Sequence, residues 1–320
     1  MTIGQLPSYD ELPIDPRMPA RSAWGVFGTD DELGTLNLLD DERVLRASRL
    51  VRKGAVFSLN WRLEEPDPPL FGRKALQHEF VDGGHRGVDD YYNRFHPQAS
   101  SQWDALSHIP HPDHGFYNGR SLEDIRPITG NKNGIHHAAR RGIAGRFVLA
   151  DVERYRRRVG RPIRNDLSDA IGVEDLEATL ADQQVELEVG DILLIRLGWI
   201  EWYEAHADPE TRRDLASSEL PRSPGLKQEP ALVRWLWDRH VAAVAADNPG
   251  LEATPFEFAV GSFLHYDLIP LLGITVGELF ELGRLADDCA SDGVYEGMFV
   301  AAPLNKLGGI GSSANALALK

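Results

Sequence analysis

The sequence predicts an α/β fold built around a central sheet, because segments with strand character alternate along the chain with segments of helical periodicity. The strand-like segments are rich in apolar and β-branched residues, and Gly, Asp or Pro bounds each of them. They lie at 55–63, 145–152, 191–199, 241–247 and 295–304. Strands in this order, with helices between them, favour a sheet covered by helices.

Three helices are predicted from apolar periodicity and end signals. The first begins at Asp40 or Asp41, either of which can cap a helix, and we expect it to end at Gly54. Its apolar side is formed by Val44, Leu45, Ala47, Leu50 and Val51. The other two predicted helices span 173–184 and 230–240, and the latter opens with a proline that suits a first helical turn.

We expect a single domain over residues 1–320. A length of 320 residues would allow two domains, but no Gly/Ser-rich or charged linker divides the chain. The proline-rich residues 1–20 and the segment 64–72 are predicted to be extended arms, loosely held in a monomer.

Composition and charge indicate a soluble enzyme. A hydrophobic content of 42% is enough for a sizeable core, and a net charge of −15 disfavours binding to nucleic acid or an anionic membrane. We expect a cytoplasmic protein, because the sequence shows neither an apolar run of membrane-spanning length nor a basic-then-apolar leader. The one cysteine, Cys289, cannot form an internal disulfide, which suits a reducing compartment.

Several common catalytic signatures are missing from the sequence. It contains no Gly-x-Ser-x-Gly, no Gly-x-x-x-x-Gly-Lys and no His-Glu-x-x-His pattern. The glycine-rich run 307–313 lacks the strand-then-helix frame of a dinucleotide site, so we interpret it as a turn. A nicotinamide-dependent redox enzyme is therefore disfavoured.

A short polar segment carries the residues best suited to chemistry. Gln98, Gln102, Asp104 and His108 supply two carboxamides, a carboxylate and an imidazole. These groups can bind a hard or borderline metal ion and place a general base beside it. In an extended strand, residues 98, 102 and 104 share one face, so we expect one strand to present all three. Taken singly, an Asp or a His in a loop is more often a turn or surface residue than a ligand.

This segment resembles the metal-binding signature of the cyclase family, the metal-dependent hydrolases that include kynurenine formamidase and isatin hydrolase. That signature reads His-x-Gly-Thr-His-x-Asp-x-Pro-x-His. Asp104 and His108 match its Asp and last His, while Gln98 and Gln102 stand at its first two histidines. A branch with Gln-x-x-Thr-Gln-Trp-Asp and a later Tyr-Asn-Gly step is closer, and residues 117–119 fit that step. Six further segments resemble family blocks in order: 24–39, 142–152, 189–199, 241–253, 263–282 and 302–318.

The resemblance implies both a metal site and a fold. In the family, a His and a downstream Glu or Gln complete the site, and His265 and Glu278 match them, so the implied ligands are Gln102, Asp104, His265 and Glu278. It is equally consistent with the sequence that His265 is a packed residue at a helix N-terminus and not a metal ligand. The implied fold is a swivelling β/β/α architecture with a central mixed sheet and flanking helices. The implied assembly is a homo-oligomer in which arms of one subunit cover the neighbour's site.

The implied reaction is hydrolysis of a small amide, cyclic amide, lactone or ester by a metal-activated water. Asp104 would hold the metal, and His108 would take the proton of the water and return it to the leaving group. Substrate contacts are predicted for Trp24, Gln98, Trp103 and Tyr117, although plain core packing explains the three aromatic residues equally well.

The two glutamines change the metal that we expect. A glutamine oxygen is a harder and weaker donor than imidazole, so manganese is favoured over zinc, or the site binds its ion poorly. Two alternatives stay open. One is a metal-free cyclase or dehydratase that uses Asp104 and His108 as an acid–base pair, and the other is a non-catalytic ligand-binding protein. In each case the expected partner is a small molecule.

Overall fold

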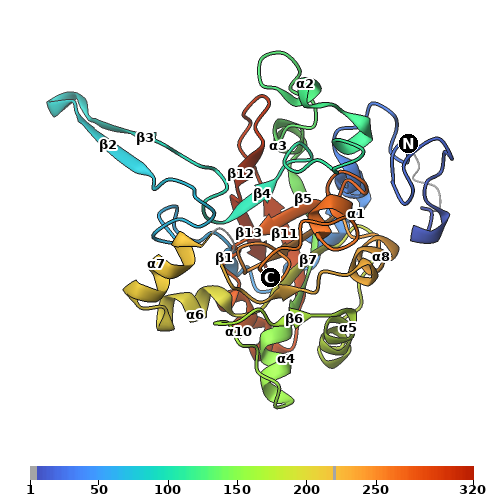
Figure 1. Ribbon diagram of the computed structural model, residues 1–320. Helices are drawn as coiled ribbons and strands as arrows, with labels where there is room; N and C mark the ends of the chain where they lie inside the picture. Colours follow the sequence, from blue (N-terminus) through green and yellow to red (C-terminus); the bar gives the residue numbers. More distant parts are fainter. Residues whose placement is uncertain (1–5, 219–220) are drawn as a thin grey trace.

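The computed structural model describes residues 6–218 and 221–320, and a nine-stranded mixed sheet lies at its centre (Figure 1). The strand order is β1-β13-β11-β5-β7-β9-β10-β4-β12. The bounds are β1 Val56–Ser58, β4 Gln102–Asp104, β5 Ile143–Asp151, β7 Ile192–Arg196, β9 Ala243–Ala246, β10 Thr275–Glu278, β11 Glu296–Ala301, β12 Gly311–Ser313 and β13 Ala316–Leu319. Helices flank the sheet, which confirms the predicted fold class.

The sheet is parallel at its centre and antiparallel toward both ends. β5, β7, β9 and β10 run parallel, whereas β4 and β12 at one end and β11, β13 and β1 at the other pair antiparallel. β12 lies at one edge of the strand order and β13 lies near the opposite edge, yet only residues 314–315 separate them in sequence. The sheet therefore curls round, and this brings β4 close to the segments that follow β1.

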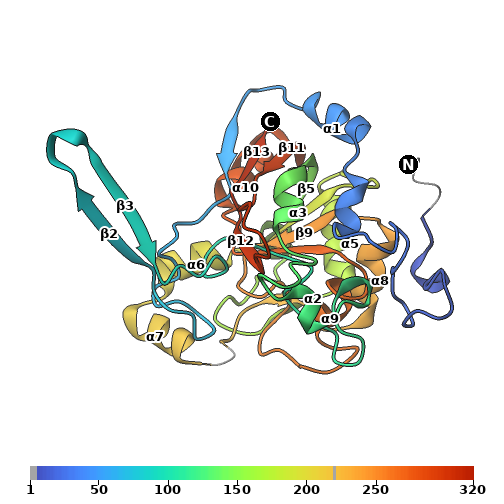
Figure 2. The same cartoon turned by 90° about the horizontal axis from the view of Figure 1, so that it is seen from above.

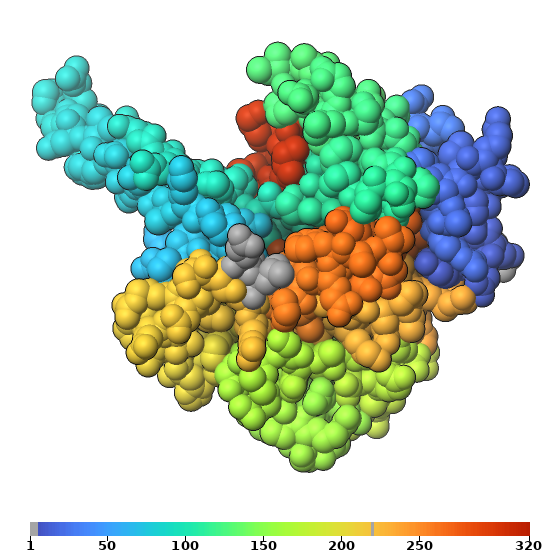
Figure 3. Space-filling view, in the orientation of Figure 1, coloured from blue at the N-terminus to red at the C-terminus, as the bar shows by residue number. Residues whose placement is uncertain are grey.

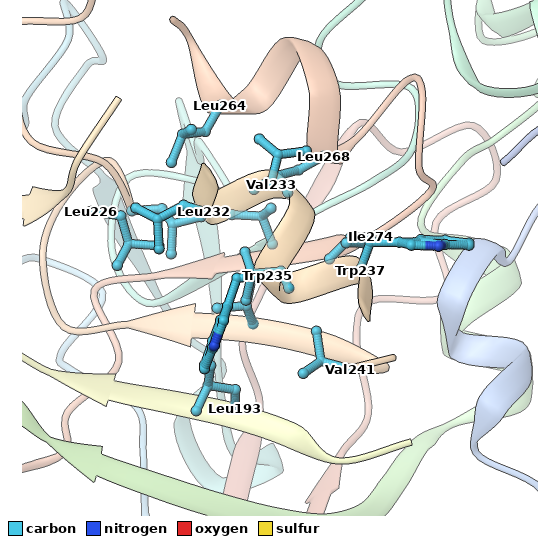
Figure 4. Packing of buried hydrophobic residues seen from close by; sticks show 14 of the residues in the cluster. Leu193, Leu226, Leu232, Val233, Trp235, Trp237, Val241, Leu264, Leu268 and Ile274 are labelled. Atoms are coloured by element: carbon cyan, nitrogen blue, oxygen red, sulfur yellow. The ribbon is translucent and has the colours of Figure 1, made fainter. Parts of the chain in front are cut away.

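Successive residues of the central strands point to opposite faces of the sheet, as strand geometry requires. In β7, Leu193 and Ile195 belong to one hydrophobic cluster, and Ile192 and Leu194 belong to another. The first cluster is covered by α5 (Val173–Asp182), α8 (Pro230–Asp238) and α9 (Leu264–Leu268). In Figure 4, Val233 and Trp235 of α8 lie between α9 and the central strands, whereas the Trp237 ring points to the side, where its indole donates to the Pro7 carbonyl. The second cluster is closed by α10 (Gly283–Asp292).

The remaining elements are short. The helices are α1 Asp41–Ser48, α2 Leu122–Ile125, α3 His136–Arg141, α4 Val152–Arg158, α6 Trp199–His206 and α7 Pro209–Ser217. Single 3-10 turns are η1 Tyr9–Glu11, η2 Gly34–Leu38, η3 Gly84–Arg86 and η4 Tyr117–Gly119, and β6 Ala170–Ile171 pairs with β8 Gly225–Leu226. None of the helices in the described part of the chain has the length and apolar character needed to cross a membrane.

The first predicted helix is present but shorter than expected. Asp40 caps α1 by accepting a hydrogen bond from the Arg43 amide at 2.9 Å. The helix ends at Ser48 rather than at Gly54, and Leu45 on its predicted apolar side is 55% exposed. Beyond it, the amides of Lys53 and Ala55 both donate to the carbonyl of Lys320, so pairing with the end of β13 replaces helical hydrogen bonds.

A hairpin that the sequence analysis missed projects from the body of the molecule (Figures 1–3). It consists of β2 (Gln77–Asp82) and β3 (Val88–Asn93), and nearly all of its side chains are exposed, Phe80 by 67% and Val88 by 61%. Gly83 and Gly84 at its tip are the turn signal that sequence reasoning overlooked.

The predicted loose N-terminal arm is wrong for the residues that the structure describes. Its carbonyl at Pro7 accepts a hydrogen bond from the Trp237 indole at 2.9 Å, and the Tyr9 amide donates to Asp238 at 2.7 Å. Asp10 also forms an ion pair with Arg234. The arm from residue 6 onward is therefore fastened along α8; residues 1–5 lie outside the described range.

Candidate metal centre and active site

Three buried side chains from three different elements converge at one point. Asp104 ends β4, Glu278 ends β10 and His265 lies in α9, and one ligand atom of each lies within 4.8 Å of the others. The Nε2 atom of His265 is 3.3 Å from Glu278 Oε1 and 3.6 Å from Asp104 Oδ2. All three residues are at most 5% exposed.

The pairing of β4 with β10 places the two carboxylates. The strands are antiparallel, and Gln102 stands opposite Glu278 in the register, so these two side chains share one face. Asp104 lies two residues further along β4 and points to the same face. Trp103, between them, points to the other face, where it packs on Phe280 and Phe299 with ring centroids 4.9 and 5.9 Å away.

Gln98 does not lie on this strand, which corrects the expectation that one strand presents Gln98, Gln102 and Asp104. β4 begins at Gln102, and Gln98 lies in the turn before it. Its side chain nevertheless reaches the site, because its Nε2 donates a hydrogen bond to Asp104 Oδ1 at 2.5 Å. Gln98 therefore holds one oxygen of the carboxylate and leaves the other available.

Glu252 is a member of the site that sequence reasoning missed. It is fully buried, and its Oε2 atom accepts a hydrogen bond from His265 Nδ1 at 2.8 Å. A carboxylate in this position keeps a proton on Nδ1 and orients the ring, so Nε2 is the nitrogen that faces Asp104 and Glu278. The available signal is the acidic residue at position 252, inside the segment 241–253 that resembles a block of the family.

The residues present fit a divalent cation. Two carboxylates and one imidazole are a donor set that metal ions accept. Two acceptors at the site, Asp104 Oδ2 itself and the additional Gln102 Oε1, are buried and have no hydrogen-bond partner in the described part of the chain. Buried acceptors without a partner are costly, and a cation would satisfy both.

His108 lies beside the group rather than inside it. Its Nε2 atom is 3.7 Å from Asp104 Oδ1, and its side chain is 24% exposed, whereas that of Asp104 is 1% exposed. The turn that follows β4 holds it there through a hydrogen bond from the His108 amide to the Ala105 carbonyl at 2.9 Å. Burial lowers the pKa of His108, so the neutral imidazole is favoured.

Burial and close contact shift the other ionisable groups in different directions. Burial and then the charge of Asp104 raise the pKa of Glu278 to about 7. Burial also opposes ionisation of Asp104, but its contacts with the imidazoles of His108 and His265 outweigh burial and lower the pKa of Asp104. Burial alone would lower the pKa of His265, yet the surrounding carboxylates, Glu252 first, raise it well above its usual value. The site thus attracts positive charge.

The three aromatic residues expected to wall the substrate pocket belong to the core instead. Trp103 and Tyr117 are 0% exposed and Trp24 is 8% exposed. The Trp103 indole donates to the Ala314 carbonyl at 3.1 Å, the Trp24 indole donates to the Pro270 carbonyl at 2.7 Å, and the Tyr117 hydroxyl donates to Asp31 at 3.0 Å. Their polar atoms are therefore used in holding the fold together.

Other aromatic rings lie against the site. Phe263 stacks on the His265 imidazole at 5.0 Å, and Phe256 lies 6.3 Å from the same ring. Phe71 in turn stacks on Phe256 at 5.9 Å, and the Arg73 guanidinium lies over the Phe71 ring at 5.4 Å. These residues carry no motif, so no local pattern in the sequence could have singled them out.

Comparisons with known proteins agree with the fold and identify a family. A family model described as "Putative cyclase" matches residues 27–253. A crystal structure described as that of a novel cyclase is 33% identical, has a TM-score of 0.82 and covers 93% of this chain and 99% of its own. No curated protein sequence matches this chain.

Two isatin hydrolases share the fold at lower identity. Isatin hydrolase A from Labrenzia aggregata, bound to benzyl benzoate, is 18% identical with a TM-score of 0.59, covering 85% of this chain and 95% of its own. Isatin hydrolase A from Ralstonia solanacearum is 18% identical with a TM-score of 0.60, covering 83% and 91%. The family model spans most of the chain and the novel cyclase nearly all of it, so this protein belongs to the cyclase family of metal-dependent hydrolases.

Proposed function

We propose that this chain hydrolyses a small amide, cyclic amide, lactone or ester with the help of a divalent cation. The observation that supports this proposal is the convergence of Asp104, His265 and Glu278 within 4.8 Å, together with oxygens of Gln102 and Asp104 that accept no hydrogen bond from any described residue. Metal ions in proteins activate water and polarise carbonyl groups, which is the chemistry that such a hydrolysis needs.

Each residue of the site has a distinct task in this proposal. Asp104 and Glu278 supply carboxylate oxygens, His265 supplies Nε2, and Gln102 offers its carboxamide oxygen. Oxygen donors outnumber the single imidazole, so we propose manganese as the preferred ion, ahead of zinc. Glu252 keeps the His265 ring in the required tautomer.

His108 is the proposed proton carrier. Its partial exposure and its distance of 3.7 Å from Asp104 place it at the edge of the buried group, where an incoming water and a substrate can reach it. A neutral imidazole there accepts the proton of the attacking water and returns it to the leaving nitrogen or oxygen. Gln98 supports this arrangement because it holds the Asp104 oxygen that lies nearest to His108.

The test is a comparison of chelated and metal-loaded protein against N-formyl aromatic amines, cyclic imides, lactones and aryl esters. We expect turnover that disappears on chelation and returns with manganese. Turnover that survives complete removal of metal would contradict the proposal and favour the metal-free acid–base pair of Asp104 and His108. Ligand binding without any turnover in the loaded protein would favour a non-catalytic role.

A further inference from the structure

We infer that Arg73 forms a subsite for a carboxylate group, so that the substrate of this enzyme is an acid that carries its scissile amide, lactone or ester bond elsewhere in the molecule. This inference rests on the proposed function, because it assigns a substrate class to the same site. Arg73 lies outside the metal-binding segment and matched no motif in the sequence.

A chain of aromatic contacts links Arg73 to the His265 ring of the metal centre. Its guanidinium lies over Phe71 at 5.4 Å, Phe71 stacks on Phe256 at 5.9 Å, and Phe256 lies 6.3 Å from the His265 ring. The guanidinium is also near enough to act electrostatically on the site. Burial lowers the pKa of Arg73, and the charges of Glu278 and Asp104 oppose this shift, so the guanidinium lies within electrostatic reach of both carboxylates.

A tight turn holds the arginine in this position. Phe71 and Gly72 both adopt left-handed backbone conformations, with φ of +57° and +67°, and the Arg73 amide donates to the Leu70 carbonyl at 3.2 Å. A left-handed conformation is unfavourable for a residue as bulky as phenylalanine. Contacts such as the stacking of Phe71 on Phe256 therefore have to maintain it.

Among the described residues, no carboxylate lies within ion-pair distance of the Arg73 guanidinium. Within the described ranges 6–218 and 221–320, it forms neither a hydrogen bond nor an ion pair, although it is partly buried. Arg146 and Arg196 show the usual arrangement in this protein, since each is paired with at least two carboxylates. A guanidinium presents two parallel N–H groups that a carboxylate can accept together. Those of Arg73 are free to bind a carboxylate of the substrate.

The charges of the site agree with an anionic ligand. A divalent cation offsets the two charges of Asp104 and Glu278, and Glu252 is engaged by His265 at 2.8 Å. Arg73 is then the cation of the site that has no bonded counter-charge, and a substrate carboxylate supplies it. The neighbouring rings of Phe71 and Phe256 offer apolar contact to the rest of such a substrate.

The test compares the binding of phenylacetate and its neutral isostere phenylacetamide to manganese-loaded wild type, Arg73→Gln, Arg73→Lys and the matched control Lys74→Gln, by calorimetry. Lys74 is the adjacent cation and is exposed. We expect Arg73→Gln to weaken phenylacetate binding by about tenfold to a hundredfold, the usual loss for hydrogen bonds to a charged group, and phenylacetamide binding by less than about twofold. The phenylacetate affinity of Arg73→Lys should fall between those of wild type and Arg73→Gln, because an ammonium keeps the charge but lacks the two parallel N–H donors of a guanidinium. Lys74→Gln should behave as wild type.

The same proteins separate this inference from the proposed function. If phenylacetate binds Arg73→Gln as tightly as wild type, or if both ligands weaken equally, the carboxylate subsite is overturned, whatever the turnover. If Arg73 discriminates phenylacetate from phenylacetamide but no amide, lactone or ester is cleaved, the subsite stands and the hydrolase proposal fails. If the protein turns over, Arg73→Gln should raise KM for 2-formamidobenzoate by a larger factor than KM for formanilide, which lacks the carboxylate. The metal content of each variant is measured alongside, because a loss of bound manganese would by itself reduce ligand binding or turnover.

Discussion

Glu252 accepts a hydrogen bond from His265 Nδ1 at 2.8 Å, and this contact fixes which nitrogen of the imidazole faces the two carboxylates of the site. The Glu252 carboxylate is fully buried and also accepts from the His265 backbone amide at 3.4 Å. The Glu252 carboxylate therefore holds both the imidazole ring and the backbone of His265. A partner of this kind also makes Nε2 a better donor to a cation.

Glu252→Gln should weaken manganese binding by about tenfold to a hundredfold, the range found when such a supporting carboxylate is removed. The physical reason is that a carboxamide holds the imidazole less firmly and does not enhance its basicity. Calorimetric titration of the chelated protein with manganese measures the change. Glu257→Gln, at a nearby exposed carboxylate, is the control. Equal affinity in Glu252→Gln and wild type would show that His265 does not depend on Glu252.

His108→Asn should lower kcat by about a hundredfold to ten-thousandfold, the effect expected when a general base is removed. The bound metal should remain, because the His108 imidazole lies 3.7 Å from Asp104 and outside the group of three ligand residues. Turnover and elemental analysis of the same preparation test this. The control is His114→Asn, an exposed imidazole that stacks on His111. A stoichiometric loss of metal would instead make His108 a ligand.

Manganese should restore more activity to chelated protein than zinc does. Three of the four donors assembled at the site are oxygens, from Asp104, Glu278 and Gln102, and oxygen donors suit manganese better than they suit zinc. Rescue assays at matched free metal concentrations provide the measurement. Better rescue by zinc would mean that an imidazole other than that of His265 joins the coordination sphere.

Trp103→Ala should destabilise the fold by about 3–5 kcal/mol, as large-to-small substitutions of buried aromatic residues do. The ring is 0% exposed and packs edge-on against Phe280 and Phe299. Urea unfolding measures the loss, and Trp103→Phe, which keeps most of the ring volume, should cost less. A stable Trp103→Ala protein with a raised KM would restore the substrate-wall interpretation that the structure corrects.

Local sequence patterns predict the strands and the motif but not the long-range pairing that completes the site. The contact between Gln102 and Glu278 joins residues 176 positions apart, and only the antiparallel pairing of β4 with β10 brings them together. Strand order is a property of the whole sheet, so periodicity within one segment does not reveal it. Glu252 and Arg73 were missed for the same reason, because their importance depends on which partners lie beside them.

One error could have been avoided with the sequence alone. Side chains alternate between the faces of a strand, so Gln102 and Asp104 on one face require Trp103 on the other. The same rule that grouped the polar residues thus excluded Trp103 from their pocket, and its 0% exposure agrees. To place Gln98 outside the strand, in contrast, one must know where β4 begins. Strand boundaries are set by pairing partners rather than by the strand's own residues.

Glu32→Gln should reduce stability at neutral pH, and this effect should vanish in acid. The Glu32 carboxylate accepts hydrogen bonds from Lys132 and from the Asn133 amide, each at 2.8 Å, and contacts His137 at 2.7 Å. Burial alone would raise the pKa of Glu32, but these three partners outweigh it and lower the pKa from 4.5 to about 2. The folded state therefore binds a proton less readily than the unfolded state, so this stabilisation is present above pH 4.5 and is lost as the pH falls toward 2.

The shift corresponds to a stabilisation of about 1–3 kcal/mol once solvent screening at the exposed Lys132 is allowed for. Urea unfolding at pH 7, 5, 4 and 3 measures the difference between wild type and Glu32→Gln, which should be constant from pH 7 to 5 and shrink below that. Glu123→Gln is the matched control, because that carboxylate is 71% exposed and its loss should leave stability close to wild type at each pH. A Glu32→Gln difference that persists unchanged at pH 3 would show that packing, and not the charge of Glu32, ties residues 132–137 to the segment before η2.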